Sequence, residues 1–385
     1  MSAAIDQVLR AAVEAGDVPC VVAMAAGDDG LIYEGAAGPR AAGGDDPVTP
    51  DTMLRIASMT KMVATTAALQ LVERGMLDLD APVDSYRPEF ADVPVLEGFD
   101  GDEPRLRPPA TRATVRHLVT HTTGLGYWFL NAGLARWEAV TGSPNVMSGS
   151  NAVFSAPMVA DPGTRFEYGI NIDWLGRVIE AVTGQSLDKV VGENVLRPLG
   201  MDDTTFAPSA RQRADCVPIH VRGEDGAWIA TGLDWAPQPE YWAGGHGLYS
   251  TPRDYLAFQR MLLGGGTLGG ERILDPATVA DAFRNHIGAL DFPAEIPTAD
   301  PPVTCDINLG PGFKWGLGLL INTESAPGLR SVGSGGWAGL FNTHFWVDPN
   351  RRVTGAIYTQ LLPFADPPAF QLYADFETAL YAATA

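Results

Sequence analysis

The chain has 385 residues, which is long for one ordinary hydrophobic core and suits two domains. Hydrophobic residues make up 46% of it and the mean hydropathy is +0.01, values that are typical of a soluble globular protein and exclude a disordered chain. The formal net charge is −20, with the acidic residues spread along the chain. This charge argues against nucleic acid or an anionic membrane surface as a main partner.

The N-terminal segment has no basic region followed by an apolar stretch, so the sequence predicts no signal peptide and a cytoplasmic location. No apolar run approaches the roughly 18 residues that a transmembrane helix needs, so we expect no membrane partner. The three cysteines, Cys20, Cys216 and Cys305, are far apart and form no CxxC pair. We therefore expect free thiols, no metal and no cofactor, and the oligomeric state stays open.

The N-terminal part of the chain predicts a helix, a hairpin and a second helix. Apolar residues recur with helical spacing over residues 3–15, and two short apolar strands follow at 18–25 and 31–35 around a Gly-Asp-Asp-Gly turn. A second helix is expected to begin at Ser58 and to run to residue 74, because the glycine that follows is typical of a helix C-terminus.

The rest of the chain changes from helical patterns to strand patterns. In the middle, separated by Pro-rich loops, we expect helices at 115–120, 171–183 and 187–196. In the last third, β-branched and aromatic runs predict antiparallel strands at 315–322, 342–348 and 353–360, followed by a helix at 370–383.

Strands at both ends and helices between them predict an α/β (α+β) fold. One antiparallel sheet flanked by helices is built from both termini, and a mostly helical domain is inserted into it. The boundaries expected are 1–75 with 215–385 for the sheet domain and 76–214 for the helical domain. We expect the long loops of the helical part to shape a pocket and the Pro-rich stretch 292–312 to cover the cleft.

Two Ser-x-x-Lys patterns offer a candidate nucleophile, whereas GxSxG, HExxH and P-loop patterns are absent. Ser186 and Lys189 lie in a context that predicts a helix N-cap and a surface lysine. Ser58 and Lys61 instead open a helix that is apolar on most sides, so the two side chains share one face of a buried helix. Burial lowers the pKa of a lysine, as a general base requires. The alternative is that Ser58 is only an N-cap.

Further motifs accompany Ser58-Met-Thr-Lys61 in order along nearly the whole chain. They are Thr114–Leu125 (TVRHLVTHTTGL), Tyr168–Gly176 (YGINIDWLG), Leu196–Met201 (LRPLGM), Gly335–Gly339 (GGWAG) and Arg74–Pro82 (RGMLDLDAP). Together they resemble the serine β-lactamase and penicillin-binding-protein superfamily, on its class C β-lactamase and family VIII carboxylesterase side. The resemblance implies the β-lactamase/penicillin-binding-protein-like fold.

The resemblance also implies a role for each matching catalytic residue. Ser58 matches the nucleophile, Lys61 its lysine, and Tyr168 the tyrosine that moves the proton from the serine to the leaving group. Trp337 stands where β-lactamases carry the lysine of their Lys-Thr-Gly strand. Leu340 would then supply one N–H of the oxyanion hole, and Ser58 the other.

The same resemblance implies further substrate contacts in two segments of the chain. Tyr127 and Trp128, just after the His-Thr-Thr-Gly turn, resemble cleft-lining residues of the esterase branch. Trp337, Ala338 and Gly339 resemble the Trp-Gly-Gly-type sequence that esterases of this group often have as a wall of the cleft.

Two departures from the β-lactamase pattern make the expected cleft more apolar. Ile170 stands where the Tyr-x-Asn motif has its asparagine, and Asn171 is one residue late and on a helix points elsewhere. The strand lysine that helps to hold a β-lactam carboxylate is replaced by Trp337. Both losses favour neutral esters over anionic β-lactams.

Three other polar groups offer weaker alternatives. His117 and His121 have the i, i+4 spacing of a zinc site, but with no third ligand nearby we expect His121 to fix its turn by hydrogen bonding. His246 lies between glycines that allow close approach of the backbone, and it is a candidate for contact with substrate. Asp173 is expected to hold structure.

The function predicted from these residues is that of a serine carboxylesterase that hydrolyses small carboxylic esters through an acyl-enzyme on Ser58, with a small-molecule ester as its partner. An acyltransferase, a D-amino-acid peptidase or a weak β-lactamase of the same fold is the alternative among enzymes. A catalytically silent member that only binds a ligand is the alternative from another class.

Overall fold

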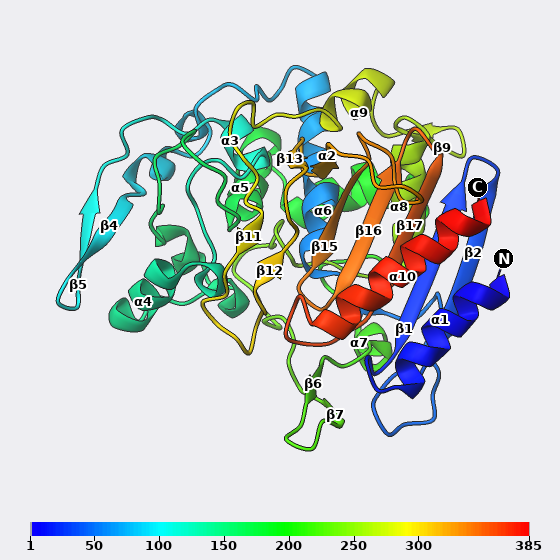
Figure 1. Ribbon diagram of the computed structural model, residues 1–385. Coiled ribbons are helices and arrows are strands. Elements are labelled where there is room, and N and C mark those ends of the chain that lie inside the picture. The colour runs from blue at the N-terminus through cyan, green and yellow to red at the C-terminus, as the bar shows by residue number, and fades with distance from the viewer. Residues whose placement is uncertain (1, 385) are drawn as a thin grey trace.

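A seven-stranded antiparallel sheet forms the centre of the computed structural model, which describes residues 2–384 (Figure 1). The strands are β1 (Val21–Gly27), β2 (Gly30–Ala37), β13 (Phe313–Trp315), β14 (Leu320–Asn322), β15 (Gly335–Gly339), β16 (Thr343–Asp348) and β17 (Val353–Tyr358). Their order in the sheet is β13-β14-β15-β16-β17-β1-β2, so that β1 from the start of the chain pairs with β17 from its end. The fold is the β-lactamase/penicillin-binding-protein-like fold that the motifs imply.

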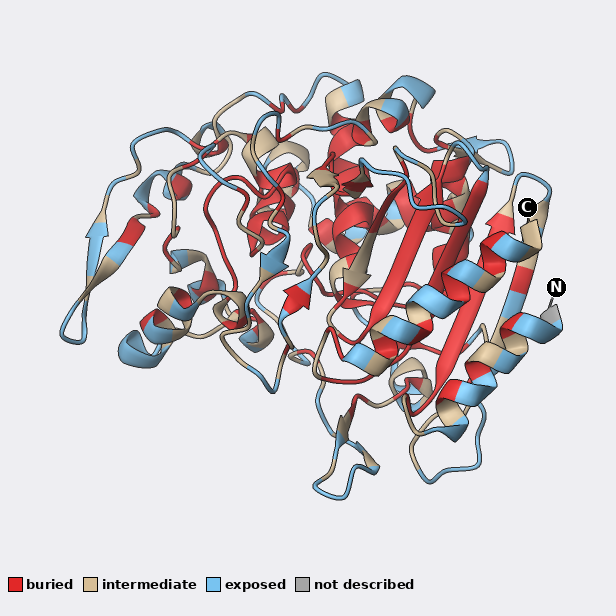
Figure 2. Cartoon of the chain, viewed as in Figure 1, coloured by how far each residue is buried: buried red, intermediate tan, exposed pale blue. Residues whose placement is uncertain are grey.

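Helices cover both faces of this sheet. Helices α1 and α10 lie side by side on one face, near the two termini, and α2 and α8 lie on the other (Figure 1). The ten helices of the described residues are α1 (Ser2–Glu14), α2 (Thr60–Glu73), α3 (Val115–Val119), α4 (Ala132–Thr141), α5 (Asn171–Thr183), α6 (Leu187–Val191), α7 (Ala210–Asp215), α8 (Pro252–Leu263), α9 (Pro276–Ala282) and α10 (Pro367–Thr384). Figure 2 shows the strands β16, β17 and β1 buried between these two layers.

Five short two-stranded sheets lie outside the central sheet in the described residues. They are β3 (Leu54–Arg55) with β8 (Tyr249–Ser250), β4 (Val95–Asp100) with β5 (Glu103–Arg107), β6 (His220–Arg222) with β7 (Trp228–Ala230), β9 (Thr267–Leu268) with β10 (Glu271–Arg272), and β11 (Glu295–Ile296) with β12 (Ile307–Asn308). The sequence predicted no strand in the β4–β5 segment, whose residues show little alternation and are mostly exposed or half-buried.

The predicted strand 315–322 was wrong in one respect, because it is two strands joined by a tight turn. Gly318 adopts a φ of +86°, which favours glycine, and Gly316 donates its N–H to the carbonyl of Leu319 at 2.8 Å. The chain reverses there, so that β13 and β14 pair with each other. The apolar run looked continuous because the residues of the turn, Leu317 and Leu319, are themselves buried.

The helix expected to begin at Ser58 begins two residues later. Residues Ala57–Met59 form a 3-10 turn, and α2 starts at Thr60. The end agrees with the prediction, because Gly75 follows with a φ of +67°. The helix predicted at 187–196 is α6 followed by a π-helical turn at Gly192–Leu196.

A test of this architecture is the packing of α10 on the sheet. Phe376 is fully buried, and its ring lies 5.7 Å from that of Trp346 on β16 and 6.1 Å from that of Tyr33 on β2. We expect Phe376→Ala to lower the free energy of unfolding by about 3–5 kcal/mol, because it removes buried area and leaves a cavity. The control Leu31→Ala, at a half-exposed position, should change it by less than about 0.5 kcal/mol. Urea midpoints measure both, and equal midpoints for the two variants would contradict this packing.

Candidate active site

Ser58 lies on a strained turn that packs against strand β15. The residue before it, Ala57, has a φ of +43°, a conformation that costs a non-glycine residue about 1 kcal/mol or more. Strand β15 lies directly against this turn, since a Cβ on Gly339 would come within 2.4 Å of the carbonyl oxygen of Ile56. A glycine is therefore required there, and the next residue, Leu340, lies beside Ser58 and lines the same cavity.

Lys61 is completely buried one turn beyond Ser58. Its Nζ lies 3.0 Å from Ser58 Oγ, 3.0 Å from the Tyr127 hydroxyl and 2.8 Å from the carbonyl oxygen of Gly245. An ammonium has three N–H donors, and these three acceptors satisfy all of them. In the neutral amine the contacts to Gly245 and Tyr127 can use the two remaining N–H groups. The lone pair is then directed at the Ser58 hydroxyl, in position to accept its proton.

Two opposing effects set the protonation of this lysine. Burial lowers the pKa of Lys61 below its usual value of 10.5, because desolvation disfavours the charged form. The carboxylate of Asp173, itself fully buried at the start of α5, raises it again through its negative charge. Burial in turn raises the pKa of Asp173, and the charge of Lys61 opposes that rise. The result is a lysine that loses its proton more easily than a solvated one.

Gly245 joins these two buried groups. Its N–H donates to Asp173 Oδ1 at 3.0 Å, while its carbonyl accepts from Lys61. A Cβ at this position would come within 2.4 Å of Asp173 Oδ2, so no larger residue fits. The Gly-Gly-His-Gly segment, which carries the candidate substrate contact His246, therefore packs against Lys61 and positions it.

Tyr168 faces Lys61 and Ser58 from the loop before α5. Its ring lies 4.7 Å from Lys61 Nζ, and its hydroxyl accepts a hydrogen bond of 2.8 Å from the Trp337 indole N–H on β15. Burial raises the pKa of Tyr168 above its usual value of 10, although hydrogen bonds from Ser58 and Trp337 oppose the rise. The phenol therefore keeps its proton near neutral pH and is able to donate it.

Asn171 is used for structure and not for binding. Its side-chain amide donates to the carbonyl of Leu125 at 3.0 Å and lies 3.0 Å from His121 Nδ1. It thereby ties the start of α5 to the His-Thr-Thr-Gly turn, where His121 itself has a φ of +53°. His117 caps α3 together with Thr114, so neither histidine is placed for a zinc site. Within residues 2–384, no group of three or more acidic, His or Cys side chains could hold a metal ion.

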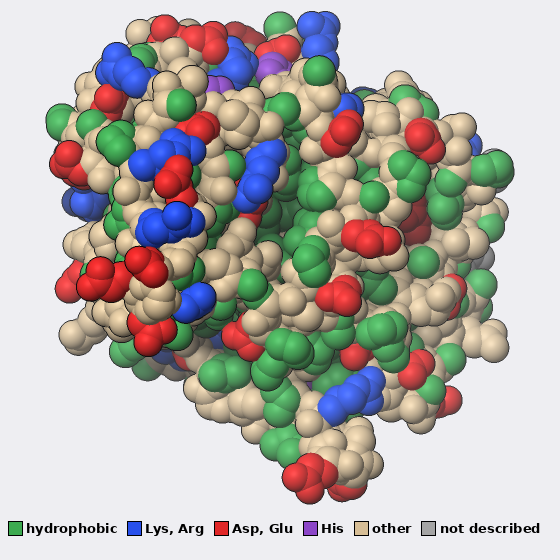
Figure 3. Space-filling model, turned by 60° about the vertical axis from the view of Figure 1, so that its left-hand side comes forward, with side chains coloured by type: hydrophobic (Ala, Val, Ile, Leu, Met, Phe, Trp, Pro, Cys, Tyr) green, Lys and Arg blue, Asp and Glu red, His purple; other side chains and the backbone are tan. Residues whose placement is uncertain are grey.

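An apolar cavity with a free volume of about 290 Å³ begins at Ser58. Of the residues expected to contact substrate, Trp337, Ala338 and Gly339 line it together with Tyr168 and Leu340. The stretch 292–312 also contributes to the lining, through Phe292, Ile296, Ile307 and Leu309. Figure 3 shows hydrophobic side chains gathered in the hollow between the two parts of the molecule, with charged side chains mostly around it.

The other four residues expected to contact substrate lie outside this lining. Tyr127 is buried and contacts Lys61, and Ile170 is buried at the start of α5. The Trp128 indole N–H donates to Asp300 at 3.1 Å. His246 borders a separate small hollow, and burial lowers its pKa to about 3, so it stays neutral. Contact of these four with substrate stays a prediction.

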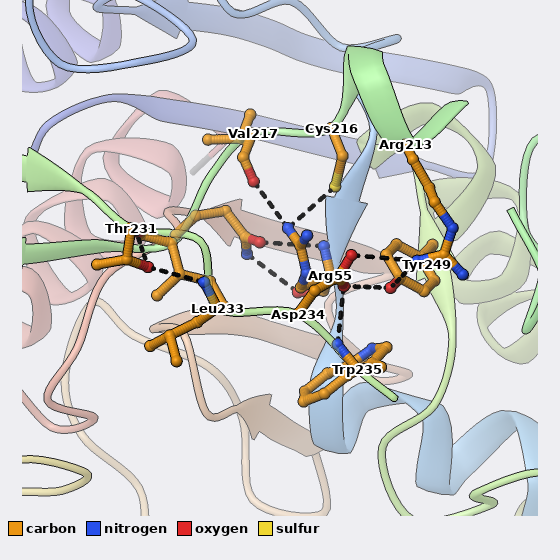
Figure 4. Close-up of polar contacts among 11 residues, drawn as sticks. Arg55, Arg213, Cys216, Val217, Thr231, Leu233, Asp234, Trp235 and Tyr249 are labelled. Atoms are coloured by element: carbon orange, nitrogen blue, oxygen red, sulfur yellow. Dashed lines mark hydrogen bonds and ion pairs between the residues drawn. The ribbon is translucent and has the colours of Figure 1, made fainter. Parts of the chain in front are cut away.

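A partly buried ionic network around Asp234 lies beside strand β3, close to the nucleophile (Figure 4). Arg55, on β3 just before the nucleophile, donates from Nε to Asp234 at 2.8 Å, and Arg213 and Tyr249 contact the same carboxylate. The ring of the following residue, Trp235, lies 5.0 Å from that of His246. The shared carboxylate thus links β3 to the segment that carries Trp235, behind the site.

The second Ser-x-x-Lys pair is on the surface, as expected. Lys189 is exposed, and Ser186 precedes α6 without a side-chain capping bond; Glu180 accepts from the N–H of Leu187 at 3.1 Å instead. The three cysteines are free thiols. None of the helices in the described part of the chain is long and apolar enough to cross a membrane.

Sequence reasoning missed three contacts that complete the site. Tyr127 is a hydrogen-bond partner of Lys61, Gly245 supplies a carbonyl, and the Trp337 indole binds the Tyr168 hydroxyl. The Tyr127 contact crosses 66 residues of sequence and the Gly245 contact 184, so no local pattern reveals them. A signal was present at Gly245, since consecutive glycines indicate close approach of a backbone.

A serine beside a buried lysine, with a tyrosine opposite them in this fold, is the arrangement of a serine hydrolase or acyltransferase. The family model described as Beta-lactamase matches residues 5–380, and the chain belongs to this family.

Its relatives include both hydrolases and transferases. Monacolin J acid methylbutanoyltransferase of Aspergillus terreus is 32% identical over 98% of this chain and 95% of its own length. Lovastatin esterase of Penicillium rubens is 31% identical over 91% of each. The solved structure of unliganded simvastatin synthase from Aspergillus terreus matches with a TM-score of 0.85 and 31% identity, over 98% of this chain and 97% of that one.

The two Ser-x-x-Lys pairs can be distinguished by covalent labelling. A fluorophosphonate probe should label the wild type and the Ser186→Ala variant equally, and it should fail to label Ser58→Ala, because Ser58 alone contacts a buried amine. Mass spectrometry of the labelled peptide identifies the modified residue. Labelling that persists in Ser58→Ala and is lost in Ser186→Ala would reverse the assignment.

The charge of Asp173 should appear in the pH dependence of that labelling. The probe reacts when Lys61 is neutral, so the labelling rate falls as the pH drops through the pKa of Lys61. His121 and His246 do not contribute to this fall, because burial lowers their pKa values and they stay neutral. Asp173→Asn removes the charge that favours the ammonium and should move this limb to lower pH. Glu193→Gln, at an exposed position, is the control. An unchanged limb, or a shift to higher pH, would contradict the coupling.

Proposed function

We propose that the protein is a serine carboxylesterase that hydrolyses small-molecule carboxylic esters through an acyl-enzyme on Ser58. The observation that carries this proposal is the buried Lys61, hydrogen-bonded to Ser58 at the mouth of an apolar cavity. In the same site an indole, and no cation, holds the hydroxyl of Tyr168. A neutral ester needs no cationic partner, whereas the carboxylate of a β-lactam does.

In the first step Ser58 attacks the ester carbonyl carbon while its proton passes to neutral Lys61. The carbonyl oxygen gains negative charge, and the N–H groups of Ser58 and Leu340 are the donors proposed for it. Such a donor typically lowers the barrier by about 3 kcal/mol. Tyr168 protonates the leaving alcohol and recovers a proton from Lys61, so the acyl-enzyme forms with both groups back in their starting states.

In the second step water attacks the acyl-enzyme. The same Lys61 and Tyr168 pair takes a proton from the water and returns it to Ser58 Oγ as the acid product leaves. Two acceptors hold Lys61 in place in both steps, because its contacts to Tyr127 and Gly245 do not involve the reacting atoms. Preorganisation of this kind lowers the barrier without reorganisation during the reaction.

Acyl transfer to an alcohol is the second candidate. The cavity is apolar, with Phe292, Phe313, Trp337 and Leu340 among its walls, and such a lining disfavours water relative to an alcohol with an apolar body. A relative that is 32% identical is a methylbutanoyltransferase. Both activities use the same acyl-enzyme and differ in what accepts the acyl group.

We expect wild-type protein to hydrolyse p-nitrophenyl acetate and butyrate and to cleave the cephalosporin nitrocefin slowly or not at all. Ser58→Ala should reduce ester turnover by roughly a thousandfold or more, as for other nucleophile removals, while Ser186→Ala should leave it unchanged. Spectrophotometric rates measure both. Nitrocefin turnover equal to ester turnover would contradict the ester preference and favour the β-lactamase or peptidase alternative.

The acceptor is identified by product analysis with an added alcohol. Formation of a new ester at the expense of free acid would favour acyl transfer. Absence of turnover together with absence of fluorophosphonate labelling in folded protein would instead favour a catalytically silent ligand-binding member.

A further inference from the structure

The cavity that begins at Ser58 continues past strand β15 to the opposite side of the sheet. Its far arm lies beneath α10, and the residues that line it there are Leu329, Arg330, His344, Phe370, Tyr373 and Glu377. The reaction at Ser58 itself requires space only for the ester group that reacts, and the far arm is not needed for it. A free volume of about 290 Å³ far exceeds the roughly 10–15 Å³ that a cavity needs to hold one water, so the cavity holds far more than an acetyl group.

A gap in strand pairing opens the passage between the two arms. Strand β14 pairs with β15 only at Gly335 and Gly336, so within the described residues Trp337–Gly339 have no strand partner on that side. The two residues that line the passage beside Trp337 are small, Ala338 and Gly339. Ala338 lies opposite His344 in the register with β16, which places the passage next to the far arm.

The cavity is elongated along two elements of the fold. From Leu340 to Gly336 the chain of β15 extends over ~13 Å, at the usual rise of a strand. From Phe370 to Glu377 helix α10 extends over ~10 Å. Because its lining residues follow both elements, the cavity is elongated and bends around the edge of a strand. A flexible chain fits this shape better than a rigid ring system.

The far arm is also effectively uncharged. Arg330 donates from Nε to Glu377 at 2.8 Å and contacts the Tyr373 hydroxyl, so its charge is paired. His344 is buried and stacks on Tyr373 with ring centres 4.5 Å apart. Burial, together with the charge of Arg330, lowers the pKa of His344 to about 3, so it is neutral at working pH. A chain that ends in a charge would therefore find no counter-ion here.

We propose that the arm beneath α10 is a second substrate subsite that binds a long, flexible, uncharged aliphatic chain. This inference rests on the proposed function, and it narrows the substrates to esters that carry such a chain on the acyl or the alcohol side. The chain leaves the reacting carbonyl at Leu340, passes Ala338 and Gly339, and lies between β15 and α10.

Two series of esters test the subsite, each used below the concentration at which micelles form. The first lengthens the acyl group from p-nitrophenyl acetate through octanoate to dodecanoate, and the second lengthens the alcohol from ethyl acetate to dodecyl acetate. Each buried methylene can raise kcat/KM by at most about fourfold. We expect a rise of at least about tenfold along one series. The series that rises identifies the side of the ester that carries the chain, and no rise in either overturns the proposal.

A matched pair of variants locates the effect. Leu329→Trp places a large side chain in the far arm, and Val332→Trp places the same side chain at an exposed position of the same β14–β15 loop. Leu329→Trp should lower the ratio of kcat/KM for the longest and shortest esters at least fivefold, and Val332→Trp should leave it unchanged. Equal ratios in both variants, with equal thermal unfolding midpoints, would contradict binding beneath α10.

A binding measurement separates this proposal from the proposed function. Calorimetry of 1-decanol with Ser58→Ala needs no turnover, and we expect binding that Leu329→Trp in the same background weakens at least tenfold. Binding without esterase activity would uphold the subsite and reject the function. Ester turnover that does not depend on chain length, without binding of decanol, would uphold the function and reject the subsite.

Discussion

The complete burial of Lys61 is the constraint on which the rest of the site depends. A buried ammonium is costly unless every donor is satisfied and a compensating charge is near. Here the acceptors come from three separate segments, through Ser58, Tyr127 and Gly245, and the charge comes from Asp173. These segments can meet only if the sheet and the helices between its two halves are both in place. The same burial makes the neutral amine accessible, so one feature determines both the local fold and the chemistry.

Strand β15 has to approach this cluster closely, and its sequence reflects that. Gly339 lies against the peptide before Ser58, where a Cβ would come within 2.4 Å of Ile56 O, and Gly336 lies equally close to the backbone of β16. Trp337, between them, extends toward Tyr168 and holds its hydroxyl. The two glycines, on opposite faces of the strand, thus allow the backbone on each side to approach closely, while the one large residue positions the proton donor.

Much of this arrangement is predictable from the sequence. The features that are not predictable depend on contacts between distant parts of the chain. Helix α5 was predicted with its observed bounds, and the fold followed from motifs in order along the chain. Ser58 and Lys61 were distinguishable from Ser186 and Lys189 by the apolar helix around them. The start of α2 was not predictable, because Ala57 adopts a positive φ that nothing in the sequence of this alanine indicates. Contacts such as that of Gly245 with Lys61 depend on tertiary packing that no spacing encodes.

The replacement of a cation by Trp337 also bears on the choice between hydrolysis and transfer. An indole at this position orients Tyr168 without attracting an anionic group, and its ring packs against that of the buried Trp315, with ring centres 4.6 Å apart. Deacylation then depends on which hydroxyl reaches the acyl carbon. Water enters an apolar cavity at a cost in lost hydrogen bonds, whereas an alcohol brings an apolar body that gains by burial. Relatives of nearly equal identity include an esterase and a transferase, so overall similarity does not decide the matter. We expect the balance between hydrolysis and transfer to depend on how completely the bound substrate fills the cavity. If the arm beneath α10 stays unfilled, it admits water. If the arm is filled, only an acceptor that fits the remaining space reaches the acyl carbon.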